Sequence, residues 1–251
     1  MLSETTIQQL RLMKIPVMAD EYARQMTDPS IGALSFDDRF GLIVEAEFSR
    51  RRNKRLSNLI KKAGFPDRNA CIENISYAPE RKLNPSQIQQ IASCAYIDRK
   101  QNVQILGATG VGKTYLANAF GIAACRKSYS VKYICLQNLL IELAVSTAQG
   151  EFNKLFTFYK NVRLLIIDDW LMFDIANDNE AAFLYHLIDA RMYTGSTIIC
   201  SQIDAQGWHD QIRNKIAADS ICDRIVNSSF KIVVEGEMRK KLAQVKVFAE
   251  A

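Results

Sequence analysis

The sequence has 251 residues and is 48% hydrophobic, which allows one large domain or a small domain beside a medium one. No apolar run approaches the roughly 18 residues of a membrane-spanning helix, and the first residues lack a signal-peptide pattern, so we expect a cytoplasmic protein with no membrane partner. The six cysteines form no C-x-x-C pair, and two histidines leave few ligands for a zinc cluster. The net charge of +5 is modest, but the cations are unevenly placed.

The N-terminal part of the chain is predicted to be a small all-helical domain, residues 1–70. An opening helix carries Ile7, Leu10 and Met13 at helical spacing, and Ser35 stands where it can cap a long helix that ends near residue 63. Glycine and prolines between residues 64 and 86 then break the helical period and indicate a linker. These breaks place a domain boundary near residue 70.

Cations crowd the segment SRRRNKRLSNLIKK, residues 49–62, which contains no acidic residue. On a helical projection one arc is apolar and suited to a core, formed by Phe48, Leu56, Leu59, Ile60 and Ala63. The opposite face is cationic and consists of Arg50, Arg51, Lys54, Arg55, Lys61 and Lys62, while Arg52 alone lies among the apolar positions. This face is either a solvated helix surface or a DNA-binding surface, on which phosphates relieve the repulsion between cations.

Beyond residue 70 the chain alternates between strands and helices, which predicts an α/β fold. Apolar strands are expected at residues 103–107, 131–135, 163–168, 196–201 and 230–235. Helices are expected at residues 113–126, 138–147, 179–193 and 206–219. Strands this apolar, separated by helices, indicate a parallel sheet covered on both faces.

The stretch GATGVGKT, residues 107–114, joins the first of these strands to a helix. Gly107, Gly112, Lys113 and Thr114 fit the pattern G-x-x-x-x-G-K-[ST], with Gly110 as a further glycine, and such a loop wraps phosphate oxygens with backbone N–H groups. The lysine reaches the β- and γ-phosphates, and the threonine hydroxyl binds Mg²⁺. The alternative is a glycine-rich turn without a ligand. The strand-loop-helix context favours a site for ATP and magnesium.

A triphosphate site also needs a carboxylate for the metal, and LLIIDD at residues 164–169 supplies two. Asp168 fits the metal-holding role, and Asp169 can orient the water that attacks the γ-phosphate. Taken alone, a strand that runs into an acidic turn is common. Together with the phosphate loop, this segment indicates ATP hydrolysis.

Five segments together resemble the IstB-type ATPases of bacterial insertion sequences, relatives of the DnaC helicase loader within the AAA+ class. They are the phosphate loop, LLIIDD, STIICSQ, ADSICDRIVNSS (218–229) and GEMRK (236–240). The resemblance extends over nearly the whole chain, including the basic helical part. It implies a P-loop AAA+ ATPase domain at residues 71–251, preceded by the helical domain.

The resemblance also implies roles for three further polar residues. Ser201 matches the polar sensor 1 position, with capping of the next turn as the alternative. Arg224 matches the arginine finger that one subunit offers to its neighbour's nucleotide, where it stabilises charge in the transition state. The alternative for Arg224 is a surface ion pair with Asp219 or Asp223.

Arg239 matches sensor 2, and its alternative is a solvated place in the RKK run. The chain departs from the usual AAA+ pattern at Asp169, where most AAA+ proteins have Glu although the IstB and DnaC branch often has Asp. It departs again at the following WLMF, where relatives commonly have an aromatic residue or leucine followed by glycine.

The function implied by the resemblance is ATP-dependent assembly on duplex DNA. Such a protein forms a homo-oligomer, as a ring or helical filament, and bends or remodels target DNA for a partner transposase. Two competitors remain open. A DnaC-like helicase loader would bind single strands, and a small-molecule phosphotransferase would need neither DNA nor neighbouring subunits.

Overall fold

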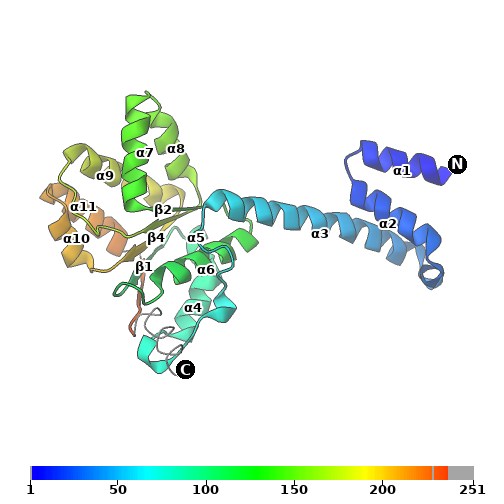
Figure 1. Ribbon diagram of the computed structural model, residues 1–251, viewed down its shortest axis with the longest axis horizontal. Helices are drawn as coiled ribbons and strands as arrows, with labels where there is room; N and C mark the ends of the chain where they lie inside the picture. The colour runs from blue at the N-terminus through cyan, green and yellow to red at the C-terminus, as the bar shows by residue number, and fades with distance from the viewer. Residues whose placement is uncertain (1, 228, 237–251) are drawn as a thin grey trace, which may run out of the picture. The chain divides into compact units, whose positions relative to one another are not determined.

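The computed structural model describes residues 2–227 and 229–236 (Figure 1). It divides into two compact units, Met1–Asn58 and Leu59–Ala251, and the division falls within the long helix α3 (Phe36–Ala63). Within the described residues, no helix is both long and apolar enough to cross a membrane.

The first unit consists of helices α1 (Leu2–Leu12) and α2 (Pro16–Thr27), the short 3-10 helix η1 (Pro29–Ala33) and most of α3. Ser35 caps α3 as predicted, because its hydroxyl accepts a hydrogen bond from the Asp38 N–H at 3.2 Å and donates one to the Asp38 carboxylate at 2.6 Å. Helix α2 was not predicted separately; it begins at a proline, which suits the first helical position.

The buried face of α3 in this unit differs from the predicted one. Ile43 and Glu47 are buried, and the Glu47 carboxylate accepts hydrogen bonds from the Val17 N–H at 3.1 Å and from Arg51 at 2.7 Å. Phe48, expected in the core, is 57% exposed. One residue turns the helix by about 100°, so packing centred on position 47 leaves position 48 outside.

The second unit is built on a parallel sheet that has five strands within the described residues. The strands are β1 (Asn102–Leu106), β2 (Val131–Cys135), β3 (Leu164–Asp168), β4 (Ser196–Ser201) and β5 (Ser229–Val233), in the order β2-β3-β4-β1-β5. Every pair is parallel, which confirms the predicted sheet. The register pairs Leu106 with Ser201, and Cys135 with Asp168, so the carboxyl ends of these strands share one edge.

Helices cover both faces of the sheet (Figure 1). They are α6 (Lys113–Arg126), α7 (Leu136–Ala148), α8 (Phe152–Asn161), α9 (Asp178–Thr194), α10 (Ala205–Gln211) and α11 (Lys215–Val226). Right-handed crossovers place α6 on one face and α7 to α11 on the other. Gly121 in α6 allows close packing, because a Cβ there would lie 2.5 Å from the Phe65 ring and 2.9 Å from Ile166. On the other face Leu165 and Ile167 join the main apolar core.

Three regions differ from the predicted elements. Residues 64–86, expected to be a linker, are packed: Ile72, Ile75 and Leu83 are buried. This stretch and the one after it contain η2 (Ile72–Asn74), η3 (Pro79–Arg81), α4 (Pro85–Ala92) and α5 (Ala95–Asp98). The helix expected at residues 206–219 is two helices, because Ile212 pairs with Ile175 as an isolated parallel bridge between them. Helix α8 was also not predicted.

Candidate functional site

The phosphate loop leaves the carboxyl end of β1 and enters α6, whose first residue is Lys113. Gly107 has φ +154°, and a Cβ there would lie 2.3 Å from the Val234 carbonyl oxygen, so glycine is required. Gly110 and Gly112 also have positive φ, +83° and +102°. At these three glycines the loop presents bare backbone ahead of a 14-residue helix, where N–H groups and the helix dipole favour an anion.

Lys113 is buried against this loop. Its ammonium donates hydrogen bonds to the carbonyl oxygens of Gly107 at 2.8 Å and Ala108 at 2.9 Å. Burial lowers the pKa of Lys113, and the nearby carboxylates oppose that effect. A cation held in a partly desolvated loop is well placed to bind a phosphate group.

The carboxylate of Asp168 is buried and is bonded on both oxygens. Its Oδ2 accepts hydrogen bonds from the Thr114 hydroxyl and from the Tyr133 hydroxyl, each at 2.7 Å, and its Oδ1 accepts one from the Asp169 N–H at 2.9 Å. A hydroxyl and a carboxylate are hard oxygen donors that suit Mg²⁺ together with substrate phosphates. The geometry therefore brings Thr114 and Asp168 together, as the motif spacing predicted.

Tyr133 is a site residue that the sequence did not reveal. It lies on β2, beside β3 in the sheet, and burial together with Asp168 raises the pKa of its hydroxyl, which remains a donor. In the sequence Tyr133 is only a hydroxyl-bearing residue two positions before the end of a strand. Whether that hydroxyl reaches Asp168 depends on which strands are neighbours in the sheet, which the sequence does not state.

Asp169 follows the end of β3 in a left-handed conformation with φ +51°. Partial burial and the adjacent Asp168 raise its pKa, while Lys113 opposes the shift. The backbone is held just beyond it, because the Trp170 N–H donates to the Cys200 carbonyl oxygen at 2.9 Å. A carboxylate with a raised pKa beside the phosphate loop has the character of a base that can orient water.

Ser201 is buried at the end of β4, and its hydroxyl has three partners. It donates to the Trp170 carbonyl oxygen at 2.9 Å and accepts from the Trp208 indole N–H at 2.9 Å and from the Ile203 N–H at 3.3 Å. The hydroxyl thus closes the turn after β4 and joins two tryptophans. The sensor 1 role of Ser201 stays a prediction. The residue after it, Gln202, is exposed.

Arg224 on α11 is held within its own chain. Its Nε donates to the Asp189 carboxylate at 2.7 Å, and its guanidinium lies 5.0 Å from the centroid of the Tyr185 ring. The bond to Asp189 raises the pKa of Arg224. The alternative partners named from the sequence, Asp219 and Asp223, do not form this ion pair; Asp189 of α9 does. The arginine-finger role stays a prediction, and Arg239 lies outside the described residues.

The predicted cationic face is exposed along α3. Two of its members meet one carboxylate, because Glu47 lies 2.7 Å from Arg51 and 4.0 Å from Arg50. Among the described residues no carboxylate pairs with the other four, Lys54, Arg55, Lys61 and Lys62. Arg52 instead lies 6.0 Å from the centroid of the Phe48 ring. Within residues 2–227 and 229–236 the face therefore keeps positive charge that is not paired with a carboxylate and that suits a phosphate backbone.

The chain is similar to several known proteins. The family model described as IstB-like ATP binding protein matches residues 5–246. An insertion-sequence ATP-binding protein of Sinorhizobium fredii is 32% identical over 241 residues, which are 96% of this chain and 98% of that protein. The ATP-binding protein of insertion sequence IS1162 from Pseudomonas fluorescens is 35% identical over 203 residues, covering 81% of this chain and 87% of that protein.

Among solved structures, the crystal structure of the DnaC helicase loader matches 66% of this chain and 97% of its own, with a TM-score of 0.56 and 17% identity. That likeness concerns the fold alone. It confirms the predicted AAA+ fold, which helices α1 to α3 precede in this chain.

Proposed function

The chain belongs to the family of IstB-like ATP-binding proteins of insertion sequences, and from that premise we propose that it hydrolyses ATP while assembled on duplex DNA, which it remodels for a partner transposase. The observation that carries the proposal is the presence, in one chain, of a phosphate loop joined to Asp168 and a cationic helix face, four of whose members pair with no carboxylate in the part of the chain that the structure describes. The proposed organisation is a helical domain at residues 1–70 and an ATPase domain at residues 71–251.

In the proposed reaction the phosphate loop and Lys113 bind the triphosphate. Thr114 and Asp168 would hold Mg²⁺, which neutralises developing charge on the phosphates when bound. Tyr133 keeps the Asp168 carboxylate oriented toward Thr114. Asp169 orients the attacking water, and its raised pKa makes it a better base than an ordinary aspartate.

Arg224 is the residue through which we expect hydrolysis to depend on assembly. In the single chain this guanidinium is paired with Asp189 and Tyr185, at a partly exposed site on α11. We propose that a neighbouring subunit's nucleotide competes with Asp189 for it, so that hydrolysis depends on contact between copies. A finger supplied by another subunit makes turnover contingent on oligomerisation.

DNA binding is assigned to the cationic face of α3. Phosphate contacts supply affinity without reading sequence, so we expect binding with little sequence preference and a steep salt dependence. Bending or remodelling duplex DNA costs of order 1–10 kcal/mol, which contacts from many assembled subunits can offset.

The test measures sedimentation and duplex-DNA anisotropy with and without a non-hydrolysable ATP analogue. The analogue is expected to increase both assembly size and DNA affinity. The double variant Lys54→Glu with Arg55→Glu should lose affinity and reduce the salt slope by about 0.9 per lost phosphate contact. The matched control, Arg99→Glu with Lys100→Glu, reverses two exposed cations in another part of the chain and should bind as the natural protein does.

Other results would favour the competitors. Preference for single strands over duplex would favour a helicase loader. An analogue that changes neither size nor binding, with turnover unaffected by DNA, would favour a small-molecule phosphotransferase.

A further inference from the structure

One sector of the ATPase fold is built from two stretches that contain no Lys or Arg. They are residues 133–153, which include α7, and residues 164–190, which include β3 and α9 as far as Ala190, and their acidic residues are Asp and Glu, in a chain whose net charge is +5. The next residue of α9, Arg191, is buried. A surface of negative charge repels a phosphate backbone. It is therefore unsuited to DNA and complementary to a cationic partner.

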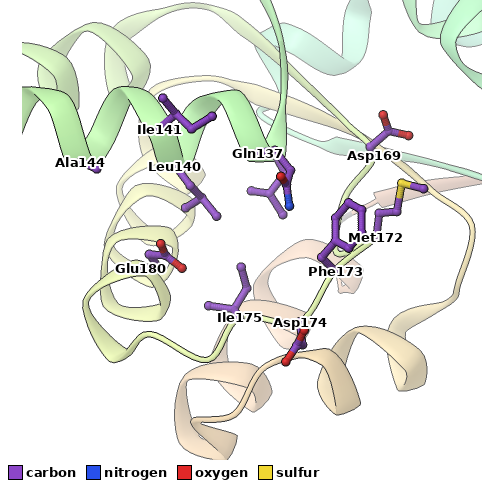
Figure 2. A pocket seen from close by; sticks show the side chains of 11 residues that line it. Gln137, Leu140, Ile141, Ala144, Asp169, Met172, Phe173, Asp174, Ile175 and Glu180 are labelled. Carbon is purple, nitrogen blue, oxygen red and sulfur yellow. The ribbon is translucent and has the colours of Figure 1, made fainter.

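A cavity of about 280 Å³ opens in this sector, between α7 and the loop that follows β3. Leu140 of α7 and Ile175 of the loop face one another across it, and Phe173 forms a wall (Figure 2). Ile141 and Phe173 remain 60% and 54% exposed. Large apolar side chains left in water around a hollow are typical of a binding surface.

Carboxylates lie around these apolar walls. Asp169, Asp174 and Glu180 all line the cavity, and Figure 2 shows Glu180 and Phe173 on opposite sides of it. Apolar walls beside several carboxylates fit a peptide in which Lys or Arg stands next to a large apolar side chain. The apolar group fills the hollow, and the cation meets the carboxylates.

We propose that this cavity is the docking site for a cationic-apolar segment of a partner protein. The inference rests on the proposed function in one respect, that the partner is the transposase. In this proposal the cationic face of α3 binds DNA, which is anionic, and the cavity with its carboxylates binds the cationic segment of the transposase.

The position of the cavity also connects docking with hydrolysis. The loop from Asp169 to Ile175 is fixed at both ends, because the Trp170 N–H donates to the Cys200 carbonyl oxygen at 2.9 Å and the Ile175 N–H donates to the Gln211 carbonyl oxygen at 2.7 Å. Within it, Asp169 and Leu171 have φ of +51° and +50°, which costs conformational energy for residues other than glycine. A segment docked against Phe173 contacts the same short loop that carries Asp169, so we expect docking to change the rate of ATP turnover.

The experiment measures fluorescence anisotropy with the full-length protein and labelled 15-residue peptides that tile the transposase encoded by the same insertion sequence. Peptides with Lys or Arg beside Leu, Phe or Met should bind, and added salt should weaken them. Ile141→Lys and Asp174→Lys should each weaken binding at least about 10-fold, because they place a cation against a cation. The control is Val145→Lys, on the same helix at a residue that is 50% exposed and does not line the cavity.

Circular dichroism and ATP-analogue binding establish that each variant folds. Two further peptides, residues 49–63 and 237–251 of this chain, test whether a second copy is the occupant. The proposal is overturned if no transposase peptide binds, if both lining variants bind as tightly as the natural protein, or if only the two peptides from this chain bind. Duplex-DNA binding is measured on the same samples. Its absence beside intact peptide binding would refute the proposed function and leave the docking site standing.

Discussion

Replacing Arg224 with alanine should separate catalysis from stability. If Arg224 completes a neighbour's ATP site, its loss lowers kcat by about 10³- to 10⁵-fold, which is roughly 4–7 kcal/mol of transition-state stabilisation. The structure predicts a much smaller effect on folding. The partners in the Asp189 ion pair are 24% and 41% exposed, so the pair contributes about 0.2–1 kcal/mol. The contact with the Tyr185 ring adds about 0.5–1 kcal/mol.

The assay mixes two inactive proteins, Arg224→Ala and Lys113→Ala. Arg224→Ala keeps an intact phosphate loop but lacks the arginine, whereas Lys113→Ala keeps the arginine but has a defective loop. A contact in which the Lys113→Ala subunit supplies Arg224 to the phosphate loop of an Arg224→Ala neighbour should therefore restore activity. In a 1:1 mixture with head-to-tail contacts, about a quarter of the interfaces should be active. ATP binding by Arg224→Ala alone should remain intact.

Failure of the mixture to recover activity would contradict the shared site. Full turnover by Arg224→Ala would do so more directly, because it would mean that Arg224 only forms the ion pair with Asp189. A protein that hydrolyses ATP at full rate as isolated single chains would contradict the dependence on assembly.

Three other changes give distinct signatures. Asp169→Asn should abolish hydrolysis and slightly raise the melting temperature at neutral pH, because the raised pKa of Asp169 means that the fold disfavours its charged form. Calorimetry should show this gain in melting temperature vanish below about pH 4, where the Asp169 carboxyl is protonated in both the folded and the unfolded state. For the same reason the acid limb of the natural protein's kcat profile should lie above the pH range of an ordinary aspartate, and an acid limb at or below that range would contradict the assignment of Asp169 as the base. Ser201→Ala should destabilise the protein by about 1–3 kcal/mol in urea unfolding, since it leaves the buried Trp208 indole N–H unpaired, and an unchanged midpoint would show that the bond contributes nothing. Gly107→Ala should eliminate ATP binding in calorimetry, because its Cβ would lie 2.3 Å from the Val234 carbonyl oxygen, and retained affinity would show that the loop can shift.

The sequence alone determined the elements whose signals are local. The buried strands are continuous apolar runs, and four of them begin and end within a residue of their predicted bounds. The phosphate loop is read from the spacing of Gly107, Gly112, Lys113 and Thr114, because φ angles and helix starts depend on neighbouring residues. The cap at Ser35 is local in the same sense. The alternation of strands and helices then sufficed for a parallel sheet.

Only the tertiary structure decided what depends on distant neighbours. Tyr133 reaches Asp168 because β2 lies beside β3, and Arg224 meets Asp189 because α11 packs on α9. Phe48 is exposed because the first helices pack one residue away on α3. The linker composition of residues 64–86 concealed a packed segment, since prolines report local breaks and not burial. Periodicity shows which side of an element can be buried, whereas the partner that buries it is fixed by packing between segments far apart in the chain.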